Sequence, residues 1–183
     1  MTESIQIASQ APSGRSAHLP SSGRRIPVST YRLQLGPDLS FDQAAAQLDY
    51  LDDLGITDLY LSPILQAAPG STHGYDVVDH TRISDVMGGR AGFERLTRAA
   101  HKRQMGIIVD VVPNHMGVPT PIYHNKAVWS VLKYGAHSPY ARWFDGTDDG
   151  YGIVMPFLGA RIGAVLANHE ITLEDRVIPG LED

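Results

Sequence analysis

Residues 106–115 (GIIVDVVPNH) combine a strand-forming run with groups that can do chemistry. Five of the six residues from 107 to 112 are β-branched and apolar, which predicts a strand buried on both faces of a parallel sheet. Burying an unpaired carboxylate is costly, so we expect Asp110, inside this run, to have a fixed partner or to face a cleft. Taken alone, the run favours a salt-bridged aspartate followed by an ordinary turn.

The end of this run is a candidate site. Pro113 has no N–H and so ends the hydrogen-bond ladder of the strand, and Asn114 and His115 follow where the strand opens into a loop. In barrels and open α/β sheets the carboxyl ends of the strands carry the chemistry. Asp110, Asn114 and His115 are therefore candidate site residues.

A second candidate is the long segment from residue 62 to residue 89. Loops beyond about 12–15 residues in a compact domain are usually functional or disordered, and this one holds too many aromatic, imidazole and carboxylate groups for a disordered linker. Gly74 allows a tight turn. Tyr75 offers a flat apolar face with a polar tip, of the kind a pyranose ring packs against, while neighbouring His and Asp side chains bond its hydroxyls. The alternative is that three side chains only tie down the loop: His73, Asp79 and His80.

The segments that must position these residues alternate between strand and helix. Residues 28–35 alternate apolar and polar, as in a strand. Ser40 and Gln43 form a capping box that begins a helix. We expect one helix running to Leu54, with Gly55 placed as the residue that ends it.

The second half of this pattern repeats the first. Residues 59–61 predict a short strand closed by Pro63, and residues 91–105 predict a helix with Gly106 at its end. We expect the strand at 107–112 to lie centrally, between the other two. Strands alternating with helices of this length indicate an α/β fold of parallel βαβ units with right-handed crossovers.

Six stretches carry a resemblance: STYRLQ (29–34), LYLSPIL (59–65), APGSTHGYD (68–76), DVVPNH (110–115), SPYARWFD (138–145) and MPFLG (155–159). Together they resemble the maltooligosyl trehalose synthases, a family within the α-amylase superfamily of (β/α)8 barrels. The likeness covers roughly residues 27–175, nearly everything except the N-terminal tail. The run at 110–115 alone indicates only the superfamily, whereas the stretches at 62–65 and 69–76 are more particular to the synthases.

The resemblance implies a role for each candidate residue. It implies that Tyr75 stacks on the sugar next to the scissile bond, that His73 and His115 bond hydroxyls of that ring, and that Asp110 pairs with an arginine near the nucleophile. Asn114 would hold the loop after the third strand, and Asp76 would be an additional sugar contact. One matching Asn does not make a calcium site, so we expect no metal.

Length predicts that the fold is partial. A (β/α)8 barrel typically needs about 250 residues, and this chain has 183. We expect residues 1–25 to be a disordered tail, 26–118 to supply the first three strands and two helices of the barrel, and 119–183 to begin an inserted domain B. Within the last part we expect a helix near 123–134 and short strands at two places: 140–144 and 171–173.

The activity implied by the resemblance is that of an isomerase, a glycosyl mutase of trehalose biosynthesis. It converts the reducing-end α-1,4 linkage of a maltooligosaccharide to α,α-1,1 by retaining intramolecular transglycosylation. Retaining chemistry needs two carboxylates about 5–5.5 Å apart, which the family takes from its fourth and fifth strands, and we find no Gly-x-Arg-x-Asp run here. We expect the nucleophile and general acid to lie beyond Asp183 and the isolated chain to be inactive and self-associating. A fragment of a hydrolytic amylase and a non-catalytic carbohydrate-binding remnant are the alternatives.

Composition argues against several classes of partner, cofactor and location. The formal charge of −5 argues against nucleic acid as a partner. The chain has no Cys, and its histidines lack the tight spacing of a metal site, so no cofactor is expected. No apolar stretch reaches the length of a membrane span, and the tail does not read as a secretory signal. A cytoplasmic protein is the default expectation.

Overall fold

The computed structural model describes residues 26–144, 158–172 and 177. The expected tail at 1–25 lies outside the described residues. The chain divides into two compact units, residues 1–126 and residues 127–183. Each unit is described by itself.

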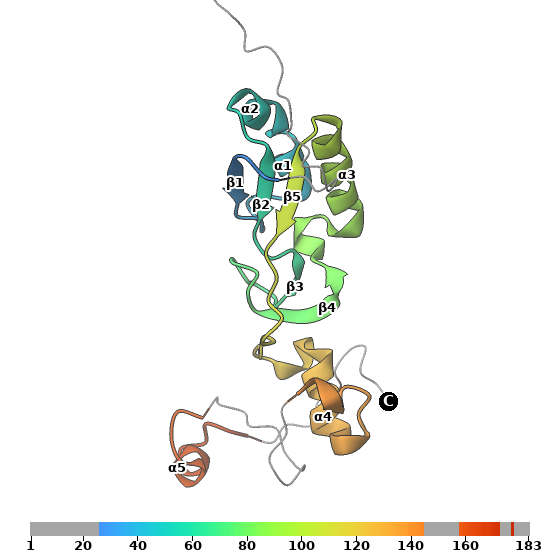
Figure 1. The fold of residues 1–183 in the computed structure, drawn as a ribbon. Helices are drawn as coiled ribbons and strands as arrows, with labels where there is room; N and C mark the ends of the chain where they lie inside the picture. Colours follow the sequence, from blue (N-terminus) through green and yellow to red (C-terminus); the bar gives the residue numbers. More distant parts are fainter. Residues whose placement is uncertain (1–25, 145–157, 173–176, 178–183) are drawn as a thin grey trace, which may run out of the picture. The chain divides into compact units, whose positions relative to one another are not determined.

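The first unit is built on a parallel sheet of three strands in the order β1-β2-β5, with β2 in the middle (Figure 1). The strands are β1 (Thr30–Leu33), β2 (Asp58–Leu61) and β5 (Gly106–Val109). The expectation that the third strand lies centrally is therefore wrong. Successive right-handed crossovers place each new strand beside the previous one, so the third adds at the edge of the sheet.

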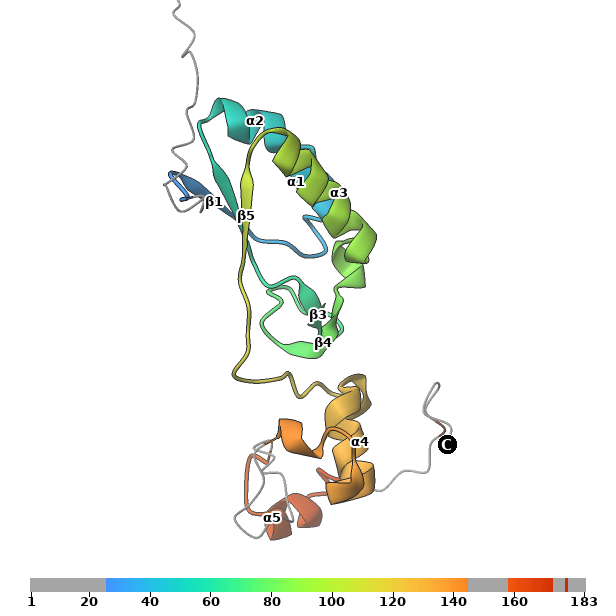
Figure 2. The same cartoon turned by 45° about the vertical axis from the view of Figure 1, so that its right-hand side comes forward.

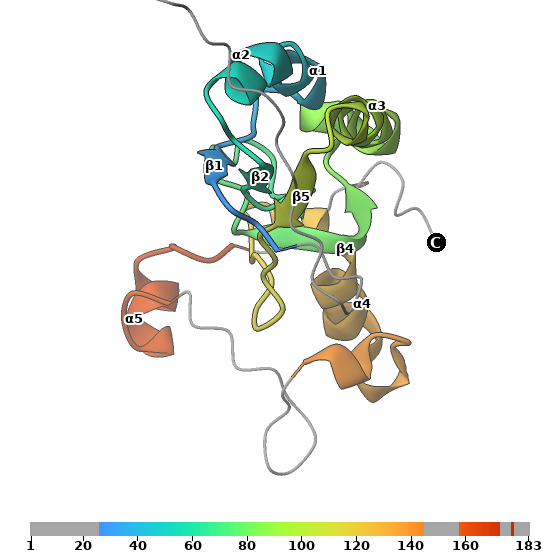
Figure 3. The ribbon, with the colours of Figure 1, turned by 45° about the horizontal axis from the view of Figure 1, so that its top comes forward.

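Three helices cover one face of this sheet, as Figures 2 and 3 show. They are α1 (Phe41–Ala45), α2 (Leu48–Asp53) and α3 (Gly89–Lys102). Strand side chains alternate between faces, so Leu59 and Leu61 point into the core while Tyr60 points away. The fully buried core lies between the helices and the sheet and includes Phe41, Leu48, Leu59, Leu61, Leu96 and Ala100.

Burial of the third strand is one-sided. Ile108, on the face that the helices leave uncovered, is 37% exposed, so the expectation of a strand buried on both faces is wrong. The helices shield only the side of β5 that carries Ile107 and Val109. Within the described residues the outer edges of β1 and β5 pair with no further strand, and self-association through such edges stays a prediction.

Local signals set the first helical segment. The Ser40 side chain accepts from the Gln43 N–H, and the Gln43 side chain accepts from the Ser40 N–H, which confirms the capping box. Gly55, at φ 95°, ends the segment, and the Ile56 N–H bonds the Leu51 carbonyl at 3.0 Å, as in a Schellman ending. The single expected helix is instead two, α1 and α2.

The interruption between α1 and α2 has a local cause. The Gln47 N–H bonds the Ala44 carbonyl at 3.0 Å, three residues back rather than four, so the last turn of α1 tightens. The next α-helical bond runs from the Leu51 N–H to the Gln47 carbonyl.

The end of α3 differs from the expectation that Gly106 ends the helix. Gln104 takes the left-handed conformation, at φ 58°, and the Met105 N–H bonds the Ala100 carbonyl at 3.0 Å. Gly106 is already the first residue of β5, where it pairs with Asp58. The left-handed residue that ends the helix is therefore Gln104, two residues before Gly106, because Gly106 is already paired in the sheet.

The segment from residue 62 to residue 89 is not the long irregular loop that the sequence predicted. It contains an antiparallel hairpin of β3 (Leu65–Ala67) and β4 (Val77–Ile83) and a 3-10 turn, η1 (Asp85–Met87). The pairing is irregular, with register shifts on both sides of Gln66. Such short and bulged strands carry no strict alternation in the sequence.

The described residues of the second unit include two short helices. The 3-10 turn η2 (Ile122–His124) still belongs to the first unit, and α4 (Lys126–Tyr134) confirms the helix expected near 123–134. The expected strand at 140–144 is wrong, because the chain there forms a 3-10 turn, η4 (Ala141–Trp143). Ile171 and Thr172 lie in no strand, and Leu173 is outside the described residues. The remaining elements are η3 (Gly135–His137) and α5 (Ile162–Ala167).

A two-pronged ion pair between α1 and α3 should give the stability of the first unit a pH dependence. Arg95 Nε and Nη2 lie 2.8 and 2.7 Å from the carboxylate oxygens of Asp42, and this hydrogen bonding lowers the pKa of Asp42. A carboxylate whose folded-state pKa is lowered adds stability above its unfolded pKa and loses it as pH falls through the folded pKa. Thermal melts should show Asp42→Asn slightly less stable than wild type at neutral pH, with the gap closing below about pH 4.

The matched control is Asp38→Asn, since the Asp38 carboxylate has no ion-pair partner among the described residues. It should show no such pH-dependent gap. A gap for Asp42→Asn that persists unchanged into strong acid would contradict the assignment.

Candidate functional site at the carboxyl edge of the sheet

The three parallel strands bring polar side chains to the face that the helices leave uncovered. Arg32 is in register with Tyr60, and Tyr60 with Ile108. Asp110 lies two residues beyond Ile108, so it points to the same face, and its N–H continues the ladder to the Leu61 carbonyl at 2.9 Å. Together with Tyr75 from the loop between β3 and β4, these residues form the carboxyl-edge cluster: Arg32, Tyr60, Tyr75 and Asp110.

Asp110 has the fixed partners that the sequence predicted. The Tyr75 hydroxyl donates to Asp110 Oδ2 at 2.6 Å, and the Tyr60 hydroxyl donates to the same oxygen at 3.3 Å. Among the described residues no donor bonds the other oxygen, Oδ1. The partners are phenols rather than a cation, so the simple salt-bridge alternative is not what the structure shows.

Arg32 and Tyr60 are members of the cluster that sequence reasoning missed. Arg32 Nη2 donates to the Tyr75 hydroxyl at 3.2 Å, and Nη1 donates to Gln34 Oε1 at 3.0 Å. The guanidinium carbon lies 5.8 Å from the centroid of the Tyr60 ring, within the range of a cation–π contact. Strand alternation could have placed both residues on the open face, but no sequence signal marks their contact with Asp110.

Charges in the cluster shift two of its pKa values. The negative charge of Asp110, followed by burial, raises the pKa of Tyr60. The hydrogen bond to Tyr75 raises the pKa of Arg32. Both shifts favour the protonated forms, so at neutral pH each group remains a donor.

The turn from residue 71 to residue 76 presents His73 and Tyr75 together. Gly74 has φ 80° and its N–H bonds Ser71 Oγ at 3.1 Å, a backbone conformation that glycine adopts freely. The rings of His73 and Tyr75 stack with centroids 6.1 Å apart and planes at 26°. Tyr75 remains 36% exposed, so its ring is available to a ligand.

The hydrogen bonds of this turn define the proton position on His73. Its Nδ1 accepts the Tyr75 N–H at 3.0 Å, so the neutral ring carries its proton on Nε2. The Asp76 carboxylate lies 3.8 Å from the same Nδ1, too far for a hydrogen bond. Asp76 instead accepts from the Ser71 hydroxyl, which ties it into the turn.

His115 and Asn114 lie beside this turn. His115 Nε2 is 3.2 Å from the Tyr75 carbonyl, and its Nδ1 is 3.2 Å from Asn114 Oδ1. The structure therefore brings His115, Tyr75 and Asp110 to the same end of the sheet, as the sequence predicted. Both His115 and Asn114 are exposed.

The backbone at Gly117 lies very close to the backbone at Asp76 and Val77, next to the candidate site. The Gly117 N–H donates to the Val77 carbonyl at 2.7 Å, and a Cβ added at Gly117 would lie 2.6 Å from the Asp76 carbonyl oxygen. Nearby, Asp79 Oδ1 accepts both the N–H and the hydroxyl of Thr81 at 2.8 and 2.6 Å, and His80 Nε2 lies 3.0 Å from the Val112 carbonyl. Asp79 and His80 thus tie down the segment, as the alternative reading held.

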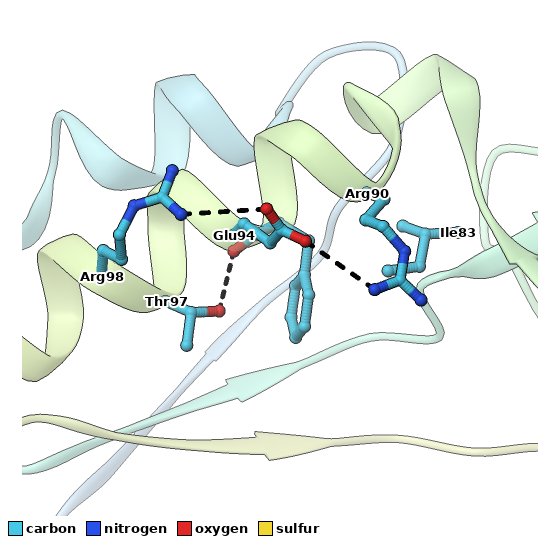
Figure 4. A pocket seen from close by; sticks show the side chains of 6 residues that line it. Ile83, Arg90, Glu94, Thr97 and Arg98 are labelled. Atoms are coloured by element: carbon cyan, nitrogen blue, oxygen red, sulfur yellow. Dashed lines mark hydrogen bonds and ion pairs between the residues drawn. The ribbon is translucent and has the colours of Figure 1, made fainter.

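A hollow away from this cluster lies along α3 and the end of β4 (Figure 4). It has a volume of about 330 Å³ and shares no lining residue with the carboxyl-edge cluster. Arg90 and Arg98 both lie within 4 Å of the Glu94 carboxylate, at 3.7 and 3.8 Å, and Thr97 bonds the Phe93 carbonyl. Since these polar groups satisfy one another, we assign the candidate site to the cluster, whose polar groups converge.

The described residues contain no group of three or more His, Asp or Glu side chains arranged to hold a metal ion. None of their helices is long and apolar enough to cross a membrane.

Comparisons with known proteins agree with the geometry. Residues 42–157 match the family described as alpha amylase, catalytic domain. The chain is 50% identical over 141 residues to a putative maltooligosyl trehalose synthase of Mycobacterium tuberculosis, covering 73% of this chain and 18% of that protein. It is 36% identical over 109 residues to the alpha-amylase MalA of Haloarcula japonica, covering 60% of this chain and 15% of that protein.

The chain is also similar to solved structures of maltooligosyl trehalose synthases. The maltooligosyltrehalose synthase of Arthrobacter ramosus is 51% identical, with a TM-score of 0.63, and the match covers 65% of this chain and 16% of that one. Another maltooligosyl trehalose synthase structure is 43% identical with a TM-score of 0.71 over 79% of this chain and 20% of that one. The chain therefore spans about a fifth of the length of the relatives it matches.

Proposed function

Since this chain belongs to the alpha-amylase catalytic-domain family, a family of the TIM-barrel superfamily, we propose that it supplies part of the sugar site of a maltooligosyl trehalose synthase. The observation that carries this choice is 50% identity over 73% of the chain to such a synthase. Identity to the alpha-amylase MalA is lower, 36% over 60% of the chain. We place residues 26–118, with strands β1, β2 and β5 and helices α1, α2 and α3, at the start of the barrel and residues 119–183 in the inserted domain.

The proposed substrate is a maltooligosaccharide. Its reducing-end glucose is released from an α-1,4 bond, turns over, and returns through its anomeric hydroxyl to make an α,α-1,1 bond. The donor chain stays on the enzyme's nucleophile between the two steps, so the anomeric configuration is retained. Water must be kept from the intermediate, or the product is that of a hydrolase.

The turn from residue 71 to residue 76 and His115 contact the sugar in this proposal. The exposed Tyr75 ring stacks on a pyranose face, and His73, with its proton on Nε2, donates to a ring hydroxyl. His115 contacts the same sugar by exchanging one of its present partners, while Asn114 holds the loop. Asp76 has one carboxylate oxygen tied to Ser71 and offers the other to a hydroxyl.

Asp110 is a supporting group rather than the nucleophile. Its Oδ2 already accepts two phenol hydroxyls, and each hydrogen bond reduces the electron density that a nucleophile needs. Oδ1 is left to pair with an arginine beside the nucleophile. In this proposal the nucleophile and the general acid are carboxylates of the family's fourth and fifth strands. This sequence contains no Gly-x-Arg-x-Asp run.

A segment exchange tests the proposed function. Residues 26–126 should replace the equivalent segment of the Arthrobacter ramosus synthase, to which the chain is 51% identical, with retention of the trehalose-ended product from maltopentaose. We expect a turnover number within about tenfold of the parent enzyme, since volume-conserving changes spread over a core are tolerated. Chromatography of the products gives the measurement.

Two controls belong to this experiment. The same exchange with the matching segment of the Haloarcula japonica amylase should lose the trehalose-ended product. The unfused 183-residue chain should form none. A folded chimaera that releases only glucose and shortened maltooligosaccharides would contradict the synthase assignment and favour a hydrolytic amylase.

A further inference from the structure

We propose that Arg32 and Tyr60 are positioning residues of the sugar site, which fix the direction of the Tyr75 hydroxyl and the rotation of the Asp110 carboxylate. This inference rests on the proposed function. It concerns two residues at the ends of β1 and β2, which reach the site through Tyr75 and Asp110 and not by touching the sugar.

The chemistry of Arg32 fixes the direction of the hydrogen bonds. A guanidinium group can only donate, so the Tyr75 oxygen, 3.2 Å from Arg32 Nη2, must accept from it. The single hydroxyl proton of Tyr75 is then committed to Asp110 Oδ2, at 2.6 Å. Without Arg32 the hydroxyl could rotate and donate to water, and the ring that receives the sugar would lose its fixed position.

Tyr60 fixes the carboxylate from the other side. Its hydroxyl donates to the same Oδ2 at 3.3 Å, so Asp110 turns this oxygen toward both phenols, and among the described residues no donor bonds Oδ1. The Tyr60 ring lies beneath the Arg32 guanidinium, at 5.8 Å, and so holds Arg32 in turn. The four groups form one connected network in which each restrains the next.

The position of the network explains why it serves ligand binding. Arg32 and Tyr75 are exposed, and none of the four side chains belongs to the buried hydrophobic core. Exposed polar contacts of this kind add little to stability. A set of directed bonds on an open face at the carboxyl ends of three strands is where preorganisation benefits a ligand.

Affinity of the 183-residue chain for maltopentaose measures the effect. The chain is captured through its N-terminus at low surface density, so that copies cannot associate, and maltopentaose flows over it. We expect Arg32→Met to weaken binding about tenfold and Tyr60→Phe about threefold, since each removes a hydrogen bond in a network that includes a charge. Arg32→Lys, which keeps a cationic donor, should recover part of the loss.

The matched controls are Arg98→Met and Tyr50→Phe. Arg98 is an exposed arginine on α3 whose ion pair is with Glu94, and Tyr50 is an exposed tyrosine on α2. Both should bind maltopentaose within about twofold of wild type, within the ordinary scatter of surface substitutions.

A double substitution separates positioning from a general structural role. If Arg32 acts through the Tyr75 hydroxyl, then Arg32→Met in a Tyr75→Phe background should change the affinity less than about twofold. A merely structural Arg32 would cause the same loss in both backgrounds and would lower the melting temperature as well. Equal losses in the two backgrounds would therefore overturn the inference.

The remaining outcomes distinguish this inference from the proposed function. If wild type binds maltopentaose and both Arg32→Met and Tyr60→Phe bind equally well, the inference is wrong and the sugar site stands. If wild type does not bind maltopentaose at all, the sugar site is wrong and the inference falls with it.

Discussion

Replacing Tyr75 with alanine should weaken the binding of maltopentaose to the 183-residue chain by at least about thirtyfold. The change removes the exposed ring that stacks beside His73, with centroids 6.1 Å apart. It also removes the hydroxyl that connects Arg32 to Asp110. Loss of aromatic contact area and of a charge-assisted hydrogen bond together accounts for an effect of this size. Surface-captured chain and flowing maltopentaose provide the measurement.

Tyr50→Ala is the control for Tyr75→Ala. Tyr50 lies on α2 and is 64% exposed, so its removal should leave both affinity and melting temperature near the wild-type values. The affinity of Tyr75→Phe for maltopentaose should lie between those of Tyr75→Ala and Tyr50→Ala, because this variant keeps the ring and loses only the hydroxyl. Undiminished binding by Tyr75→Ala would show that the sugar does not contact this turn.

Replacing Gly117 with alanine should destabilise the first unit by about 2–4 kcal/mol, in the range of overpacking a close contact. The new Cβ would lie 2.6 Å from the Asp76 carbonyl oxygen and 2.9 Å from its carbonyl carbon. Because both atoms belong to the backbone, the two segments must separate, and the Gly117 N–H would lose its 2.7 Å bond to Val77. Chemical denaturation followed by circular dichroism measures the loss.

Gly36→Ala is a matched control, since Gly36 is also buried and also has no positive φ. The nearest atom to its added Cβ is the Thr72 carbonyl oxygen at 3.8 Å, which is ordinary contact. This variant should stay within about 1 kcal/mol of wild type. Equal stabilities for the two variants would mean that the segments can move apart freely.

The sequence by itself determined the features whose partners are close along the chain. Ser40 and Gln43 are three residues apart, so their capping box is legible from residue types alone, and Gly55 is legible as a helix end for the same reason. Asp110 and His115 could be proposed for one site because chemistry sits at the carboxyl ends of parallel strands, and the family resemblance added Tyr75 to them. The class of sheet followed from the alternation of elements.

Only the tertiary structure decided which residues meet. Gly106 looks like the end of a helix in the sequence, but it pairs with Asp58 as the first residue of β5. The left-handed conformation that follows the helix is adopted by Gln104 instead. The hairpin of β3 and β4 has too few regular pairs to leave a period in the sequence. The exposure of Ile108 depends on which face of the sheet the helices cover, and this cannot be predicted from a continuous run of apolar residues.

The same limit applies to the site. The contact between Arg32 and Tyr75 spans 43 positions, and that between Tyr60 and Asp110 spans 50. Each depends on the register of the parallel strands, which sets the row that holds Arg32 and Tyr60 side by side. A shift of one residue would turn those side chains into the helix-covered face. The residue types therefore indicated which chemical groups the site contains, and the strand register decided which of these groups contact one another.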